Sequence, residues 1–362
     1  MKKQTRRHFL KSLSATALGA VVSTGRTVAA PAPIALGLDN FALRAMGWKA
    51  SSLIEYAASL QLDTLFLSDL DCLPSLETGA LAEVKAQADA AGLAVYVGSW
   101  SICPTAVRFK NNWGTAEEHL LTGIRVAKTL GSPVFRVILG SGEDRKTPGG
   151  INARIADTLS VLRKCRGAAL DAGIRIAVEN HAGDMHSWEL ARLVEQAGPD
   201  FVGVNLDSGN AAWTLEDPMD VLERLGPFTI CSSLRDDMIW ETAEGASVQW
   251  TAVGEGLVDW PRYVSRWKEL CPNAPFQIET ISGFSKAFPY ESDAFWQHYD
   301  KRPESLAKFK ALAKRGRPLT PFKAPEGQDK KAAEQAYQKG EVERSITYCR
   351  NVLKLGRKGH QA

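Results

Sequence analysis

The cysteines of this chain do not follow a recognised spacing pattern. Its 362 residues include six scattered cysteines, and no pair has the CxxC spacing. This distribution argues against a dense disulfide framework and against CxxC redox or zinc sites. We therefore expect mostly buried thiols in a large domain, and a disulfide between two of them stays open. The six are Cys72, Cys103, Cys165, Cys231, Cys271 and Cys349.

Strong net charge is also missing. The formal net charge is +3, and basic residues at the two ends supply more than that excess. The middle of the chain therefore has no electrostatic reason to bind nucleic acid. No GxGxxG follows the first apolar run, and no glycine-rich loop that would cradle a phosphate is evident, which disfavours dinucleotides and phosphorylated substrates. The terminal basic residues are Lys2, Lys3, Arg6, Arg7, Lys11, Arg357 and Lys358.

No apolar run near the start is long enough to cross a bilayer. The weakly apolar stretch Leu13 to Val22 is shorter than the ~20 residues that a spanning helix needs. It follows the segment Thr-Arg-Arg-His-Phe-Leu-Lys at residues 5–11 and precedes small residues around 28–30. This order is typical of an export signal and resembles the twin-arginine type. We predict that residues 1–30 are a removable signal and that the protein is exported to the periplasm without a stable membrane anchor.

Short apolar runs alternate with longer amphipathic stretches from residue 33 onward, which predicts strand and helix units building a parallel sheet. Eight such units most economically close into a (β/α)₈ TIM barrel, which we place at residues 31–283. An open doubly wound sheet is the alternative, but the missing GxGxxG disfavours it. The predicted strands are Ile34–Asp39, Thr64–Ser68, Ala94–Ser99, Val134–Leu139, Ile174–Asn180, Val202–Asp207, Thr229–Leu234 and Phe276–Thr280.

A C-terminal extension, residues 284–362, follows the eighth predicted strand. Its first part, Lys286–Asp300, is rich in aromatic residues, and we expect it to pack back on the barrel. Residues 316–328 are rich in Pro, Lys and Gly and are typical of a linker. The stretch Lys330–Leu355 predicts one or two charged helices, for which a solvated or dimerising role is the simplest interpretation.

Three of the predicted strands have an acidic residue at or next to their end, in short and recognisable surroundings. They are Glu179 of the fifth strand, Asp207 of the sixth and Glu279 of the eighth. The carboxyl ends of barrel strands share one rim, so these groups are expected to converge there and to repel one another unless protons or a cation neutralise them. Oxygen ligands favour Mn²⁺, Mg²⁺ or Co²⁺, and an added imidazole would also suit Zn²⁺. His181 shares a strand face with Glu179 and is a candidate for that role.

At these carboxylates the sequence resembles the xylose-isomerase-like superfamily of sugar isomerases and epimerases, over approximately residues 33–282. The Leu-Asp-Ser-Gly-Asn segment at 206–210 and the Gly-Glu-Gly-Leu-Val-Asp-Trp segment at 254–260 carry the resemblance. It implies that Glu179, Asp207 and Glu279 bind one divalent metal ion and that the two glutamates also act as acid and base. The superfamily includes a DNA-repair nuclease branch, which needs a multinuclear zinc site. This chain has only six histidines, and three of them lie in the predicted signal (His8), in a predicted helix (His119) and in the tail (His360).

The sequence departs from this pattern after the seventh strand. Relatives have His-(Leu/Val)-Lys-Asp where this chain has Ser233-Leu234-Arg235-Asp236, and a neutral hydroxyl is a poor metal ligand. The candidates for an additional metal ligand or substrate contact are therefore His181, His186, Ser233 and Asp236. The residues expected to bind substrate are Arg136, Asn210, Arg235 and Glu255.

These residues predict a divalent-metal-dependent isomerase or epimerase of a small unphosphorylated sugar or polyol, acting through a metal-stabilised enediolate. Elimination from a keto sugar and decarboxylation of a keto acid share that intermediate, so a lyase is the second interpretation. A non-catalytic sugar-binding protein is the third. The expected partner is a small carbohydrate, and a homo-oligomer stays open.

Overall fold

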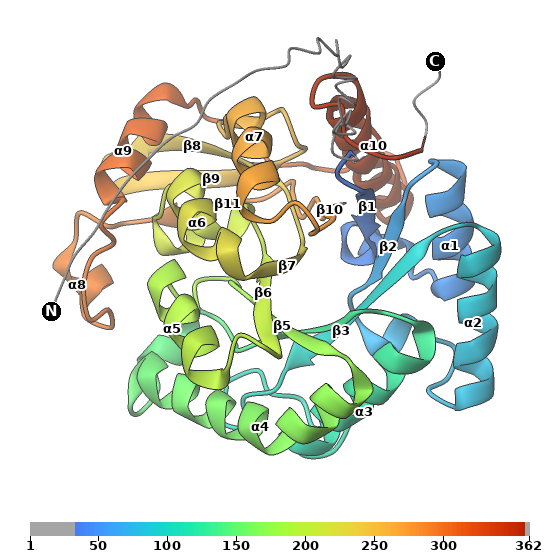
Figure 1. Ribbon diagram of the computed structural model, residues 1–362. Coiled ribbons are helices and arrows are strands. Elements are labelled where there is room, and N and C mark those ends of the chain that lie inside the picture. The colour runs from blue at the N-terminus through green and yellow to red at the C-terminus, as the bar shows by residue number, and fades with distance from the viewer. Residues whose placement is uncertain (1–32, 359–362) are drawn as a thin grey trace, which may run out of the picture. The chain divides into compact units, whose positions relative to one another are not determined.

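The computed structural model describes residues 33–358. The predicted signal at residues 1–30 lies outside them. Eight parallel strands form one sheet in the order β10-β1-β2-β3-β4-β5-β6-β7 (Figure 1). A parallel bridge between Leu234 and Ile278 joins the segment after β7 to β10 and closes the barrel. The strands are β1 (Leu36–Asp39), β2 (Thr64–Leu67), β3 (Ala94–Ser101), β4 (Val134–Ile138), β5 (Arg175–Glu179), β6 (Val202–Leu206), β7 (Thr229–Ser232) and β10 (Phe276–Ile278).

Each of the eight predicted strands overlaps one barrel strand, so the predicted TIM barrel is confirmed and the open sheet is wrong. The strands read as apolar runs because both of their faces are buried, inside the barrel and beneath the helices. The outer helices are α1 (Ala50–Ser59), α2 (Thr78–Ala90), α3 (Ala116–Leu130), α4 (Gly150–Ala172), α5 (Ser187–Ala197), α6 (Pro218–Leu225) and α7 (Trp260–Leu270).

Local signals in the sequence set where these helices begin and end. At the start of α3, Thr115 and Glu118 form a reciprocal capping box, and Gly131 ends the helix in the left-handed conformation at φ 74°. Helix α7 begins after Asp259, whose side chain accepts a hydrogen bond from the backbone of Arg262. Short 3₁₀ turns follow several strands: η1 (Asn40–Met46), η2 (Leu70–Cys72), η3 (Gly142–Lys146), η4 (Gly209–Thr214) and, before β7, η5 (Gly226–Phe228).

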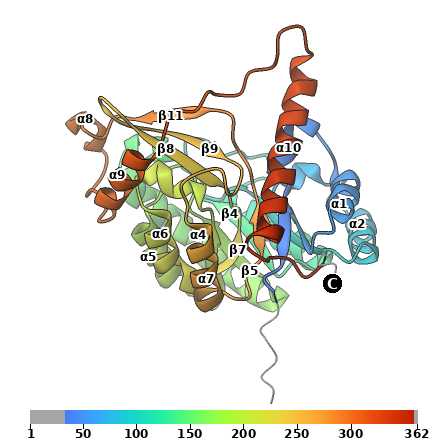
Figure 2. The same ribbon diagram turned by 90° about the horizontal axis from the view of Figure 1, so that it is seen from above.

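A small antiparallel sheet, which the sequence analysis did not predict, covers one side of the barrel mouth. It contains β8 (Asp236–Thr242), β9 (Gly245–Thr251) and β11 (Ser285–Phe288), in the order β11-β9-β8. The short helices α8 (Asp293–Trp296) and α9 (Leu306–Arg315) lie on the same side of the molecule (Figure 2). Phe288, Tyr290 and Trp296 share a second apolar core with this sheet and with Ala212 of η4. The aromatic segment therefore packs back on the barrel, as expected.

The last helix, α10 (Lys330–Asn351), is one continuous helix with a buried face. It lies beside β1 and η1, in the place of the outer helix that a regular barrel has directly after its eighth strand (Figures 1 and 2). Val342, Ile346 and Cys349 belong to the main barrel core, and the backbone N–H of Val253 donates to Ser345 Oγ at 3.0 Å. The interpretation of this segment as a solvated appendage is therefore wrong, because seven of the 22 residues of the helix are buried. A dimerising role stays a prediction.

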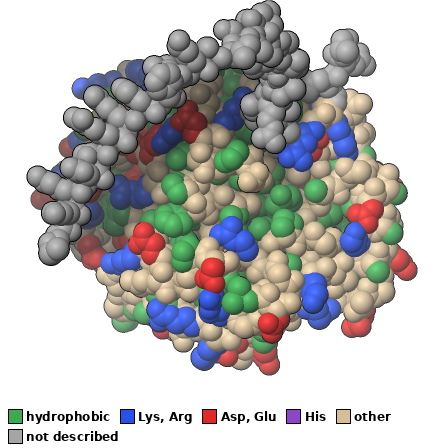
Figure 3. All heavy atoms as spheres, viewed as in Figure 1, with side chains coloured by type: hydrophobic (Ala, Val, Ile, Leu, Met, Phe, Trp, Pro, Cys, Tyr) green, Lys and Arg blue, Asp and Glu red, His purple; other side chains and the backbone are tan. Residues whose placement is uncertain are grey.

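Two general properties of the described residues agree with the composition. All six cysteines are free and buried thiols. Charges of both signs are interspersed on the face seen in Figure 3, as the small net charge implies. Within residues 33–358, no helix has the length and apolar character needed to span a bilayer.

Candidate active site

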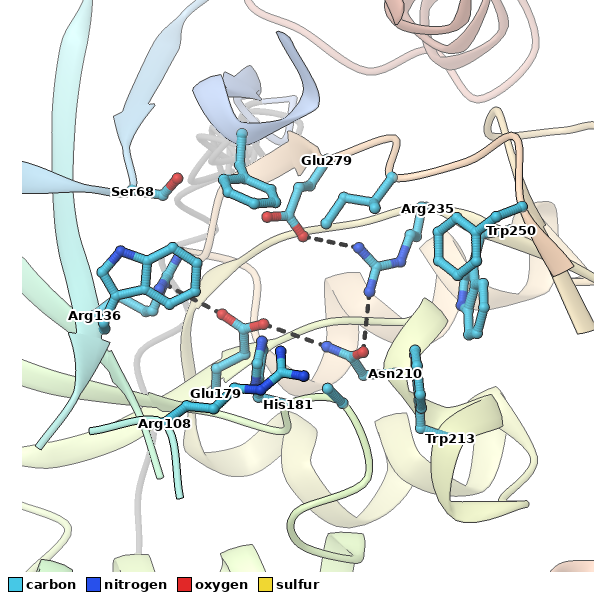
Figure 4. Close-up of a pocket in the computed structure, with 15 residues that line it drawn as sticks. Ser68, Arg108, Arg136, Glu179, His181, Asn210, Trp213, Arg235, Trp250 and Glu279 are labelled. Atoms are coloured by element: carbon cyan, nitrogen blue, oxygen red, sulfur yellow. Dashed lines mark hydrogen bonds and ion pairs between the residues drawn. The ribbon is translucent and has the colours of Figure 1, made fainter. Parts of the chain in front are cut away.

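A cavity of about 270 Å³ lies at the carboxyl ends of the barrel strands. Its floor is polar and its walls are aromatic (Figure 4). It is lined by Phe41, Ser68, Trp100, Arg108, Arg136, Glu179, His181, Ala182, Asn210, Trp213, Arg235, Trp250, Glu279, Ile281 and Phe284. This is the face on which (β/α)₈ enzymes carry their chemistry.

The three predicted carboxylates converge beneath this cavity. Glu179, Asp207 and Glu279 each offer one oxygen, and these oxygens all lie within 4.8 Å of one another. Their residues are 2%, 0% and 4% exposed, respectively. Three carboxylates this close and this dry require compensating positive charge or protons.

The ends of β5 and β6 are joined by Asn180. Its side chain donates to the carbonyl of Asp207 at 2.8 Å and accepts from the backbone N–H of Asp207 at 2.9 Å. One carboxylate oxygen of Asp207 then accepts from the backbone N–H groups of Gly209 and Asn210, at 2.8 and 3.1 Å. The Asp-Ser-Gly-Asn turn therefore orients the Asp207 side chain through its own backbone.

Arginine supplies part of the compensating charge. The Arg235 guanidinium bridges two carboxylates, with Nη2 at 2.8 Å from Asp207 Oδ2 and Nη1 at 3.0 Å from Glu279 Oε2. Arg136 Nε lies 3.2 Å from Glu179 Oε2. Asn210 connects the two halves, because it accepts from Arg235 at 3.0 Å and donates to Asp207 at 2.6 Å and to Glu179 at 3.3 Å.

Burial shifts the acids of this cluster in one direction. Desolvation raises the pKa of Asp207 to about 7, against the opposing charge of Arg235. It also raises the pKa of Glu179, against Arg136, and holds the pKa of Glu279 well above its ordinary value. The two arginines are therefore too few to stabilise all the carboxylates as anions.

Asp39 is a fourth acid of the cluster, which the sequence analysis missed as a functional residue. It ends β1, is fully buried, and accepts hydrogen bonds from Ser68 Oγ at 2.6 Å and Ser233 Oγ at 2.9 Å. The signal was present, because Asp39 ends the first predicted strand in the same way that Glu179 ends the fifth. Ser233, a candidate ligand, is committed elsewhere: its Oγ donates to Asp39 and accepts from Asn205 Nδ2 at 3.1 Å.

His181 lines the cavity and is held in one tautomer. Its Nδ1 lies 2.6 Å from the carbonyl oxygen of Gly140, so Nδ1 carries the proton and Nε2 keeps its lone pair. Burial lowers the pKa of His181 to about 4, which keeps the imidazole neutral at physiological pH. It does not join the close group of three carboxylates, so its place is on the cavity wall.

Three other predicted residues lie away from the cavity. His186 caps α5 and stacks on Trp188, with ring centres 4.0 Å apart. Asp236 accepts from Trp260 Nε1 at 2.6 Å and from the backbone of Gly254 at 3.0 Å, so it holds the loop before α7.

Glu255 pairs with Arg344 of α10, with Nε to Oε1 at 2.6 Å, on the outer surface. We predicted that Glu255 binds substrate, but the structure places it outside the lining of the cavity. The Gly-Glu-Gly segment instead joins the barrel to its last helix.

The sequence of the chain also matches a known family. A family model described as the xylose isomerase-like TIM barrel matches residues 54–285, which is more than half of the chain. The chain belongs to this family. No curated protein matches it in sequence.

Solved structures of the xylose isomerase-like fold are similar to the chain at low identity. A D-psicose 3-epimerase in the presence of D-fructose is 14% identical with a TM-score of 0.58, and the match covers 88% of this chain and 99% of that one. A D-psicose 3-epimerase with D-tagatose from Clostridium cellulolyticum H10 is 13% identical with a TM-score of 0.54, covering 87% and 99%. The IOLI protein with a zinc atom is 14% identical with a TM-score of 0.54, covering 79% and 100%. At these identities the likeness shows the fold alone.

This xylose isomerase-like cavity has the charge and donors to fit a divalent cation. Four buried carboxylates, those of Asp39, Glu179, Asp207 and Glu279, face two guanidinium groups, those of Arg136 and Arg235. The excess of two acids over the arginines and the three converging oxygens suit an oxygen-ligated ion. The residues that would hold it are Glu179, Asp207 and Glu279, without a ligand from Ser233.

Aromatic side chains form two opposed walls of this cavity. Phe41 and Trp100 meet edge to face, with ring centres 5.9 Å apart. On the other side Trp213 and Trp250 stack at 4.9 Å, and Phe284 lies 5.0 Å from Trp250. Walls of this kind match the apolar faces of a sugar ring, while the polar floor matches its oxygens.

Proposed function

We propose that this protein is a divalent-cation-dependent isomerase or epimerase of an unphosphorylated sugar. The observation that carries the proposal is the convergence of Glu179, Asp207 and Glu279, within 4.8 Å, beneath an aromatic-walled cavity, in a cluster with more acids than arginines. Buried acids in excess of the cations around them destabilise a purely structural ion cluster. Such an excess is expected where the site binds a further cation and a polar ligand.

Two glutamates reach the cavity from different strands. Glu279 comes from the end of β10 and Glu179 from the end of β5, on opposite sides in Figure 4. Arg235 holds Glu279 through Oε2, and no hydrogen bond within residues 33–358 engages Glu279 Oε1. Arg136, Asn205 and Asn210 hold both oxygens of Glu179. We assign proton removal to Glu279, whose free oxygen lines the cavity, and the opposing proton transfer to Glu179.

The proposed reaction removes one proton from a carbon of the sugar and delivers one proton to a carbon. Glu279 takes the proton from the carbon beside a carbonyl, the C–H electron pair enters an enediolate, and a carboxyl group returns a proton. Return from Glu179 on the other side inverts the carbon. Return to the former carbonyl carbon, with the hydroxyl proton of the first carbon passing to the former carbonyl oxygen, isomerises the sugar. A bound divalent cation would supply charge stabilisation for the developing enediolate. Arg235 and His181 would orient the substrate hydroxyl groups, with His181 Nε2 as an acceptor.

The relatives are consistent with this class of reaction. Two structures of the same fold are named as D-psicose 3-epimerases, studied with D-fructose and D-tagatose, and a third has a bound zinc atom. Such sugars match the unphosphorylated substrate that we propose here. The small cavity also suits a single sugar unit.

The test is proton exchange. D-fructose, D-psicose and D-tagatose are incubated with the purified protein and Mn²⁺ in D₂O and followed by NMR. We expect deuterium on a carbon beside the carbonyl and the appearance of an epimer or isomer, both absent with Glu279→Gln. Release of new fragments would instead support the lyase, and unchanged spectra with all three sugars would refute the proposal for these substrates.

A further inference from the structure

A second, larger space adjoins the cavity. It has a volume of about 520 Å³ and shares Arg108, Ala182 and Trp213 with the cavity lining. We call this space the outer cleft. The two spaces therefore meet along three residues, which places the outer cleft directly beside the cavity that holds the carboxylates.

Segments outside the regular barrel build most of the outer cleft. One wall comes from η3 and the Ala182–Gly183 turn, and the other comes from the Lys286–Tyr299 segment, which includes β11 and α8. That segment presents two half-buried rings, Phe295 and Tyr299, which stack with centres 5.6 Å apart and an angle of 15° between their planes. Arg145 lies over the Tyr299 ring at 4.6 Å and holds it in place.

Two cations mark the junction between the spaces. Lys286 Nζ lies 4.7 Å from the centre of the Trp213 ring, and Arg108 is exposed at the shared edge. Neither Arg108 nor Lys286 forms an ion pair with a carboxylate of residues 33–358, whereas Lys146 nearby pairs with Glu143 at 2.9 Å. Their N–H groups are therefore available to acceptors on a ligand that passes from one space to the other.

We propose that the outer cleft is a second sugar subsite and that the natural substrate is a glycoside of at least two rings. The keto-sugar unit lies on the carboxylate floor, the glycosidic oxygen passes Trp213 and Lys286, and the second ring lies against Phe295 and Tyr299. Aromatic rings and donor groups are the usual components of such subsites. This inference rests on the proposed function for its inner unit, but the outer cleft stands on its own residues.

The experiment compares one sugar with the same sugar extended. The probes are D-fructose and three glycosyl-fructoses, namely isomaltulose, maltulose and lactulose, with Mn²⁺ present. We measure binding by calorimetry and turnover by deuterium incorporation. We expect at least one glycosyl-fructose to exceed D-fructose in kcat/KM by about tenfold or more, since additional subsite contacts raise transition-state binding.

Lys286→Ala is the diagnostic variant. We expect it to lower kcat/KM for the preferred disaccharide about tenfold more than for D-fructose. The matched control is Lys310→Ala. Lys310 also lies over an aromatic ring of the extension, that of Tyr290 at 4.8 Å, but it lines neither space. We expect Lys310→Ala to leave kcat/KM unchanged for both the disaccharide and D-fructose.

The outcomes separate the two proposals. Exchange with D-fructose but no preference for any disaccharide in binding or turnover would overturn the second subsite and leave the reaction intact. Disaccharide binding that Lys286→Ala weakens, without any proton exchange, would support the subsite and overturn the reaction. An equal effect of Lys286→Ala on both kinds of sugar, or no binding of any disaccharide, would also overturn the subsite.

Discussion

Two buried ionic clusters in this protein use the same residue types to different ends. At the start of α5, Arg145 Nη2 lies 2.5 Å from Glu189 Oε2, and His186 contacts both partners. At the barrel mouth, Arg235 bridges Asp207 and Glu279 in a similar way. We call these the α5 cluster and the mouth cluster.

The difference lies in charge balance. In the α5 cluster one arginine pairs with one glutamate, and burial lowers the pKa of His186, which keeps it neutral. Burial alone would raise the pKa of Glu189, but the hydrogen bond from His186 and the charge of Arg145 lower it to about 2. In the mouth cluster the pKa of Asp207 rises to about 7 despite Arg235. In a balanced buried pair the two charges compensate each other, whereas a surplus of acids marks a place built for a further cation or proton.

The largest expected effect separates the clusters by activity. Glu279→Gln removes a proton carrier from the mouth cluster and should lower kcat by about 10³-fold, the usual scale for a general acid or base. Glu189→Gln should leave kcat within about twofold of the unaltered protein. Deuterium exchange rates at saturating sugar measure both, with circular dichroism to verify folding. Similar losses in the two variants would erase the distinction that we draw.

Stability should respond in the reverse order. Glu189→Gln leaves the Arg145 charge buried without its anion, so the free energy of unfolding should fall by about 3 kcal/mol. Asp207→Asn, measured without divalent cations, removes one surplus acid and should not lower the free energy of unfolding, because the ionised form of Asp207 is itself unfavourable in the folded protein. Urea unfolding in the presence of a chelator provides both values. A larger loss for Asp207→Asn would make the mouth cluster a structural one.

Divalent cations should act on the mouth cluster alone. Mn²⁺ at a hundred times its Kd should stabilise the protein by about 2.7 kcal/mol, since it binds only the folded state. Thermal unfolding with and without chelator should show this increase in the unaltered protein and in Glu189→Gln, but not in Asp207→Asn. An equal response of Asp207→Asn would place the cation elsewhere.

The smallest effect is a dependence on pH. The folded-state pKa of Asp207 is raised, so between its ordinary value of 3.8 and about 7 the folded protein binds more protons there than the unfolded chain. Stability without cations should therefore fall as pH rises through this window, by about 1 kcal/mol per unit from this group. Glu189, with a lowered pKa, contributes stability that is present above pH 4.5 and is lost as the pH falls toward 2. Unfolding free energies at pH 5 and 7 in chelator should show a shallower fall for Asp207→Asn than for the unaltered protein.

Much of the barrel was predictable because its information is local. A strand buried on both faces requires a short apolar run. A run such as Val134–Ile138 can be recognised in the sequence without knowing which strands lie beside it. The motif around Asp207 likewise orients its own carboxylate through the adjacent backbone N–H groups of Gly209 and Asn210. These features stay recognisable in one sequence, since few of their contacts depend on distant residues.

The sequence by itself therefore determined the eight strands and the three carboxylates that end them. Tertiary structure alone decided that Arg235 lies between two of those acids, that Ser233 is occupied by Asp39, and that Glu255 faces away toward α10. It also decided that α10 closes the barrel and that the aromatic segment builds the outer cleft. The reason is physical: these arrangements depend on contacts between residues far apart in the chain, and no local periodicity or motif encodes which distant side chain will meet which.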